Sequence, residues 1–174
     1  DWLMLVSTRF SSAYNNGNGP LFDADDPTVT RLFNHPPFRR AFLRTVLAAV
    51  EGPLAAAQCD PVMDAKYASL VANGVTMCDG SALTDPSAVK TWFRQRRAVL
   101  QGQLDAVAAP FTVAGPDSVT TFTNAIAFSG TAPLGADRIL ANGIAWPVTW
   151  TSVTNWVLSM PVAPGMGSIT LTAV

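Results

Sequence analysis

The sequence predicts an α+β fold in two units, a helical bundle-like lobe followed by a small antiparallel β-sandwich. Apolar residues recur at helical spacing before Gly115-Pro116, whereas they alternate with a period of two after it. Charge is also unevenly divided, because only three charged residues follow that point: Asp117, Asp137 and Arg138. We therefore expect two domains, residues 1–114 and residues 115–174.

Four helices are predicted in the first unit. An aspartate followed by proline favours a helix start, since the carboxylate caps free N–H groups and proline fits the first turn. This signal predicts helices at residues 27–34 and 86–107, and another that begins at Asp60-Pro61 and stops at Asn73-Gly74. A further helix is expected at residues 37–50, with its apolar residues on one face and its arginines on the other.

Short strands separated by turn residues are predicted in the second unit. Asn142-Gly143 lies between two apolar runs, which is a strong hairpin signal because both residues tolerate positive φ. Other strands are expected around residues 119–123, 126–128, 148–150, 156–160 and 169–172. This spacing is typical of an immunoglobulin-like sandwich, although the Cys-Trp-Cys pattern of antibody domains is missing.

The composition excludes several classes of protein. Apolar residues make up 49% of the 174 residues and charged residues 13%, so the chain is not disordered by composition. A net charge of −1 gives no electrostatic case for nucleic acid or an anionic membrane. No apolar run reaches the ~20 residues of a membrane span. The chain begins at Asp1 and ends within a strand pattern at Val174, so we expect a piece of a longer polypeptide.

Two cysteines, Cys59 and Cys78, leave two interpretations open. A disulfide between them would fit an extracellular protein. Two unpaired thiols are the alternative, because spacing alone does not show whether the Cβ atoms meet. Two cysteines do not make a metal site, which needs four ligands.

The N-terminal segment holds the only weak metal candidates. Residues 1–6 form an apolar run that predicts a buried strand, and a loop rich in Asn and Gly follows. Asp23, Asp25 and Asp26 come next, with oxygen ligands at a spacing that would suit Ca²⁺. Helix capping by Asp25 and Asp26 is the competing interpretation.

Arginines and tryptophans supply the remaining candidate surfaces. Arg94 and Arg97 lie on one predicted helix and would bind a phosphate or a carboxylate of a partner, or else serve the fold itself. Trp146, Trp150 and Trp156 would form a platform for stacking sugars if exposed, or a core if buried. No residue is assigned to catalysis and no cofactor is expected.

Several motifs in order resemble the C-terminal part of spore-coat-protein-H-like (CotH-like) kinase domains. They are Asn34-His35-Pro36-Pro37-Phe38-Arg39, Asp60-Pro61, Asp64, Lys66-Tyr67, Asp85-Pro86, Trp92-Phe93-Arg94-Gln95-Arg96-Arg97, Leu100 and Gln103-Leu104. Residues 129–156 look like the small β module that often follows such domains in large bacterial exported proteins.

The resemblance implies a kinase-like fold that uses ATP and a divalent metal to phosphorylate secreted or surface proteins. It places the nucleotide lysine and the catalytic base upstream of Asp1. The family's metal-binding aspartates usually follow a strand that resembles Trp2–Leu5, but here Val6–Phe10 contains no carboxylate and Arg9 would repel a metal.

We therefore expect a non-catalytic piece of an exported, cell-surface or extracellular bacterial protein with a structural or adhesive role. Its partners would be other segments of a longer parent chain or cell-surface proteins, without nucleic acid. Two alternatives stay open. The chain would be the distal part of a secretory CotH-type kinase whose catalytic residues lie upstream, or a carbohydrate-binding module that takes a glycan.

Overall fold

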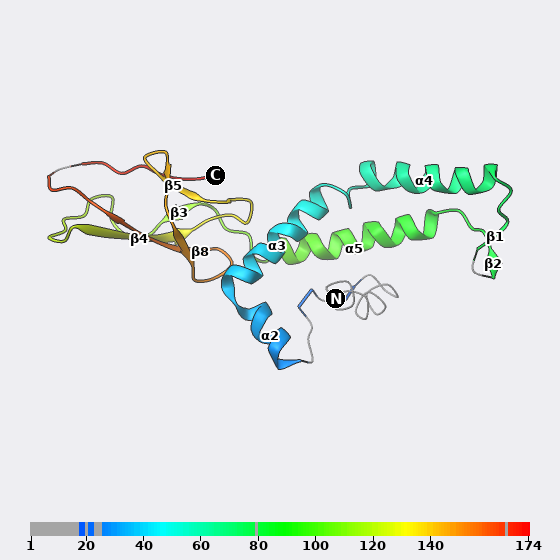
Figure 1. The fold of residues 1–174 in the computed structure, drawn as a ribbon, viewed down its shortest axis with the longest axis horizontal. Helices are drawn as coiled ribbons and strands as arrows, with labels where there is room; N and C mark the ends of the chain where they lie inside the picture. Colours follow the sequence, from blue (N-terminus) through cyan, green and yellow to red (C-terminus); the bar gives the residue numbers. More distant parts are fainter. Residues whose placement is uncertain (1–17, 20, 23–25, 79, 166) are drawn as a thin grey trace. The chain divides into compact units, whose positions relative to one another are not determined.

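A computed structural model describes residues 18–19, 21–22, 26–78, 80–165 and 167–174. These residues form an α+β fold, in which four described helices precede two small antiparallel sheets that pack together (Figure 1). The strand predicted at residues 1–6 lies outside the described residues. None of the described helices is long and apolar enough to cross a membrane.

Contacts between residues divide the chain into two compact units. Among the described residues, one unit contains residues 48–103 with 18–19 and 21–22, and the other contains residues 26–47 and 104–174. Helix α3 (Pro36–Glu51) contributes to both units. The domain boundary at residue 115 expected from the sequence stays a prediction.

Helices α2 (Pro27–Asn34) and α3 agree with the predicted helices. The carboxylate of Asp26 caps α2, since its Oδ1 accepts hydrogen bonds from the N–H groups of Thr28 at 2.6 Å and Val29 at 3.4 Å. These two bonds lower the pKa of Asp26, with the bond from Thr28 contributing most. The cap therefore uses the carboxylate that the sequence also offered as a calcium ligand.

Helix α4 (Ala56–Ala72) begins before the predicted start at Asp60-Pro61, so that prediction was wrong. Pro61 lies inside the helix. The N-cap residue is Ala55, whose side chain makes no capping hydrogen bond. Alanine has the highest helix propensity, so the run Ala55–Ala57 extends the helix toward the N-terminus. The stop at Asn73-Gly74 is confirmed, with Gly74 at a φ of 72°.

Helix α5 (Ser87–Asp105) follows Asp85-Pro86, as predicted. Between α4 and α5 lies a small hairpin that the sequence analysis missed, β1 (Met77–Cys78) paired with β2 (Ser81–Ala82). Each strand has only two residues, which is too short for alternation to be recognised.

The sandwich consists of two antiparallel sheets. One has the order β3-β4-β8-β7 and the other β6-β5-β9. This is the arrangement of strands A-B-E-D and C′-C-F in an immunoglobulin-type sandwich. The bounds are β3 (Thr112–Val113), β4 (Ala125–Thr131), β5 (Ile139–Ala141), β6 (Ile144–Ala145), β7 (Val148–Trp150), β8 (Asn155–Pro161) and β9 (Leu171–Ala173).

Local sequence explains one turn of the sandwich and fails at another segment. Asn142 and Gly143, with φ values of 52° and 80°, join β5 to β6 as the hairpin signal predicts. The strand expected at residues 119–123 is wrong, because no strand is described between Val113 and Ala125. There the hydroxyl of Thr123 donates to the carbonyl of Ala125 at 2.7 Å, a local bond that competes with strand pairing.

Trp156 is the largest fully buried side chain of the sandwich core. Its ring stacks on Phe111 with centroids 5.9 Å apart, and Ile139 and Leu158 are buried in the same cluster. Its indole Nε1 has no hydrogen-bond partner among the described residues. The core therefore uses this indole for its volume rather than for its polar group.

Gly130 allows β3 to approach β4 closely. A Cβ at this position would lie 1.9 Å from the carbonyl oxygen of Thr112 and 3.0 Å from the ring of Trp156. The backbone of β3 itself occupies the space that a side chain would need. A glycine is therefore required where β4 passes β3.

Arg40 of α3 is the one buried charged residue among the described residues, with 3% of its surface exposed. Its guanidinium donates to the carbonyl oxygens of Val153 at 2.6 Å, Pro133 at 2.8 Å and Ala136 at 2.7 Å. It also lies 3.5 Å from the ring centroid of Trp150. The expected placement of every α3 arginine on a separate polar face is thus wrong for Arg40.

The environment of Arg40 explains why its burial is tolerated. The three acceptor carbonyls belong to segments outside the strands, where backbone groups lack ladder partners. Burial lowers the pKa of Arg40 to about 10, and the positive charge of Arg44 adds to this effect while Asp137 opposes it. Arg40 therefore remains charged at neutral pH and binds α3 to the sandwich.

We expect Arg40→Met to lower the free energy of unfolding by about 3 kcal/mol, because it removes the donor from the carbonyls of Val153 and Ala136. Arg44→Met is the matched control. Arg44 lies one turn along α3, and its Nη1 is 2.8 Å from Asp137 Oδ1. The substitution removes only this surface ion pair, so it should change the free energy of unfolding by less than about 1 kcal/mol. Urea unfolding followed by circular dichroism measures both. Equal effects of the two variants would contradict the assigned role of Arg40.

We expect Gly130→Ala to destabilise the sandwich by more than about 3 kcal/mol, since the new methyl group overlaps the backbone of β3. Gly135→Ala is its control, because a Cβ there meets no atom within 4 Å. Thermal unfolding of the two variants provides the measurement. A Gly130→Ala protein as stable as wild type would show that β3 does not lie at this distance.

Candidate functional site

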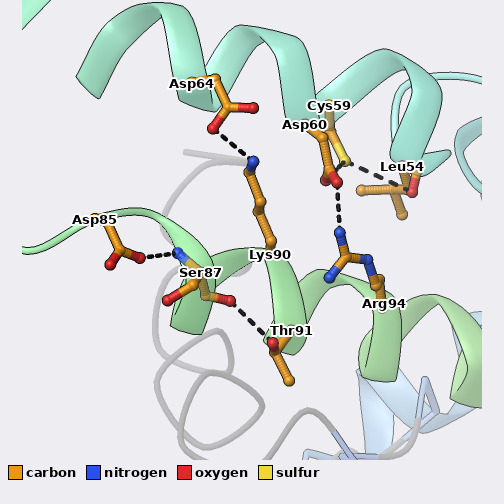
Figure 2. A network of polar contacts seen from close by, with 9 residues as sticks. All are labelled: Leu54, Cys59, Asp60, Asp64, Asp85, Ser87, Lys90, Thr91 and Arg94. Carbon is orange, nitrogen blue, oxygen red and sulfur yellow. Dashed lines mark hydrogen bonds and ion pairs between the residues drawn. The ribbon is translucent and has the colours of Figure 1, made fainter. Parts of the chain in front are cut away.

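An open hollow of about 470 Å³ lies between α4 and α5. Helix α4 contributes Asp64 and Tyr67 to its lining, and α5 contributes Lys90, Thr91 and Arg94. Asp85 and Pro86, which precede α5, and Ser87, its first residue, complete the lining. Figure 2 shows the polar contacts around it, including Lys90 with Asp64, Arg94 with Asp60 and the N–H of Ser87 with Asp85.

Asp85 defines the N-terminal end of α5. Its Oδ1 accepts a hydrogen bond from the N–H of Ser87 at 2.8 Å. Bonds from the hydroxyl and the N–H of Ser87 lower the pKa of Asp85, and Lys90 makes a smaller contribution in the same direction. This carboxylate therefore satisfies a free N–H group of the helix and stays ionised.

Two ion pairs join α4 to α5. Lys90 Nζ lies 2.5 Å from Asp64 Oδ1, and Arg94 Nη2 lies 2.5 Å from Asp60 Oδ2. Both acids and both bases are four residues apart, so each pair of like charges lies on one face of its helix. No residue of α4 is fully buried, so these pairs lie close to solvent. The sequence analysis missed this matched spacing, although it was visible.

The charges of the hollow largely cancel. A helix N-terminus with Lys90, Arg94 and two hydroxyl groups would suit an anion. Lys90, Arg94 and the N–H of Ser87 already pair with Asp64, Asp60 and Asp85, so an anion would compete with these carboxylates. Within the described residues, no group of three His, Cys, Asp or Glu side chains could hold a metal ion. The arrangement therefore favours a structural network.

Cys59 is a half-buried free thiol in the structure, with its Sγ 3.6 Å from Asp60 Oδ1. Helix α4 alone places about 20 Å between Cys59 and the end that leads into β1, which contains Cys78. A disulfide needs Cα atoms within about 7 Å. The side chain of Cys78 lies outside the described residues, so the predicted pairing stays a prediction, which this arrangement does not favour.

Arg94, Arg96 and Arg97 are all engaged by the chain itself. Arg94 binds Asp60, as described above, and Arg97 Nε donates to the carbonyl oxygen of Val50 at 2.9 Å. Arg96 donates to the carbonyl oxygen of Gly19, and burial lowers its pKa. Of the two arginines proposed for a partner, Arg94 is the more available, since 56% of its side chain is exposed.

The three candidate tryptophans pack within the sandwich. Trp156 is fully buried, and Trp146 and Trp150 are half-buried against the same cluster. The guanidinium of Arg40 covers one face of Trp150. The structure thus brings these indoles to the core and does not present them as one flat surface.

The remaining candidate metal ligands either cap a helix or lie outside the described residues. Asp26 caps α2, whereas Asp23 and Asp25 lie outside the described residues, so the calcium site stays untested. The segment Val6–Phe10, where the resemblance expects metal-binding aspartates, also lies outside them.

We expect Asp85→Ala to lower the melting temperature at pH 7, because α5 loses its cap. The pKa of Asp85 is lowered in the folded state, so the cap stabilises above the unfolded value of 3.8 and is lost as pH falls through the lower folded value. The difference from wild type should therefore shrink below pH 3.8. Asp117→Ala, in the loop after β3, is the control, and a pH-independent difference would exclude the cap.

Comparisons with known proteins identify no relative. No family model matches the chain, and no curated protein or solved structure shows significant similarity to it.

Proposed function

We propose that this chain is a non-catalytic module with a structural or adhesive role in an exported bacterial protein at the cell surface. The observation that carries the proposal is the use of Arg40. A charged guanidinium is buried, bound to three carbonyls and stacked on Trp150, which supports a role in holding α3 on the sandwich.

The hollow between α4 and α5 supports the same interpretation. Its acids and bases form pairs or caps, and such groups are poor candidates for proton transfer, which requires a group held near its reacting partner with a matched pKa. The pKa of Asp85 is lowered rather than raised, which keeps this carboxylate charged and acceptor-only at neutral pH.

The resemblance to CotH-like proteins supplies the proposed location. Modules of immunoglobulin type recur in surface proteins, where a rigid sandwich acts as a spacer or an adhesive domain. The alternating strands and the buried Trp156 fit such a rigid unit.

A glycan-binding role receives less support. Sugar stacking needs an exposed aromatic face. Trp156 offers none, and Arg40 covers a face of Trp150.

Two assays of the purified 174-residue chain test the proposal. With radiolabelled ATP and Mg²⁺, we expect no transfer of phosphate to the chain or to a protein substrate above a heat-denatured control. In the source cells, an antibody against the chain should label intact and permeabilised cells equally. Phosphotransfer would refute the non-catalytic role, and labelling only after permeabilisation would refute the surface location.

A further inference from the structure

Nearly the same tetrapeptide, Ala-Asn-Gly followed by Val or Ile, occurs twice among the described residues. One copy, Ala72–Val75, begins at the last residue of α4. The other copy, Ala141–Ile144, forms the hairpin between β5 and β6. Because the neighbouring side chains almost match, any difference in reactivity between the two asparagines comes from the fold around them.

An asparagine that precedes glycine can lose its side-chain amide without an enzyme. Glycine has no Cβ to shield its backbone nitrogen. This nitrogen forms a bond to Cγ of the asparagine, the Cγ–Nδ2 bond breaks, and the displaced nitrogen leaves as ammonia with the proton of the glycine N–H. Water then opens the cyclic imide to aspartate or isoaspartate. The reaction therefore depends on how readily the fold lets the two atoms meet.

The side chain of Asn142 is held at both of its polar atoms. Its Oδ1 accepts a hydrogen bond from the N–H of Thr170 at 2.8 Å, and its Nδ2 donates to the carbonyl oxygen of Ser168 at 3.4 Å. The N–H of Asn142 also donates to the carbonyl oxygen of Thr170 at 2.8 Å. Ala141, directly before it, is 1% exposed. Cγ of Asn142 can thus reach Gly143 only if bonds beside a buried strand break.

Asn73 is held only by the last turn of its own helix. Its Nδ2 donates to the carbonyl oxygen of Ser69 at 2.8 Å, and the N–H of Gly74 donates to that of Val71 at 3.0 Å. Every residue from 68 to 74 is exposed. A helix end without buried side chains opens at little cost in free energy. One such opening frees both the amide of Asn73 and the nitrogen that attacks it.

We propose that Asn73 is a site of spontaneous deamidation in the folded protein, at which water is the only co-reactant, whereas Asn142 keeps its amide. The product carries a carboxylate at the C-terminal end of α4, where the helix dipole disfavours negative charge. The carboxylate also cannot donate to the carbonyl oxygen of Ser69. The modification therefore loosens the last turn of α4. It does not rest on the proposed structural role.

Peptide mapping by mass spectrometry tests the site. The folded chain is incubated at mildly alkaline pH, and the deamidated fraction at each pair is followed over time. We expect Asn73 to react at least about tenfold faster than Asn142, since opening a buried sheet costs more than fraying a helix end. In guanidinium chloride the two rates should converge, because the local sequences almost match. Equal rates in the folded chain, a faster Asn142, or no reaction at Asn73 would overturn the proposal.

Two variants at Asn73 test the consequence for α4. Asn73→Asp carries the charge of the product and should speed hydrogen exchange of the amide groups at residues 70–74 at least about threefold. Asn73→Gln is the matched control, because it keeps an uncharged amide and should exchange at nearly the wild-type rate. Circular dichroism confirms that both variants are folded. Equal exchange in the two variants would contradict the loosening of the last turn.

Discussion

The hydrogen bonds of Arg40 connect helical and β structure within one compact unit. Loop segments of a small sandwich leave carbonyl groups without strand partners, and burying such groups unpaired costs about 1–3 kcal/mol each. Arg40 reaches three of them from α3 and covers Trp150 at the same time. The planar guanidinium suits this task, because its several N–H donors spread in fixed directions. A lysine, with one compact charge, would not serve these acceptors and the indole together.

Helices α4 and α5 associate on a different physical basis. Two ion pairs between long charged side chains bridge the two helices, and no residue of α4 is fully buried. This leaves an open hollow between them. The hollow resembles a binding site in its residue types, but the charges there bind one another. From its residue types alone the hollow would be taken for an anion-binding site, which its contacts do not support.

The sequence predicted the features that depend on local chemistry. The starts of α2 and α5 and the turn at Asn142-Gly143 follow from caps and from positive φ, which act over a few residues. The start of α4 was missed because Asp60-Pro61 was taken as a helix start. The helix instead begins in the alanine run before it and contains Pro61. The two-sheet sandwich was recoverable from its period-two segments, but not the short β1–β2 hairpin.

The candidate site could be predicted only in part. That Arg94 meets Asp60, or that Arg40 is buried, depends on contacts between residues distant in sequence. Helical periodicity places an arginine on one face of its helix but does not show which carbonyl groups of other segments lie next to that face. Period-two alternation also does not fix how deeply each indole is buried: Trp156 lies in the core, whereas Trp146 and Trp150 are partly buried against it.

The ion pairs between α4 and α5 lie near water, so they respond to dissolved salt, whereas the contacts of Arg40 do not. At physiological ionic strength the Debye length is about 8 Å, and exposed pairs such as Arg94 with Asp60 are weakened further as salt rises. The bonds of Arg40 lie out of reach of mobile counter-ions. Rising ionic strength thus weakens the α4–α5 ion pairs, while the contacts that hold α3 on the sandwich keep their strength.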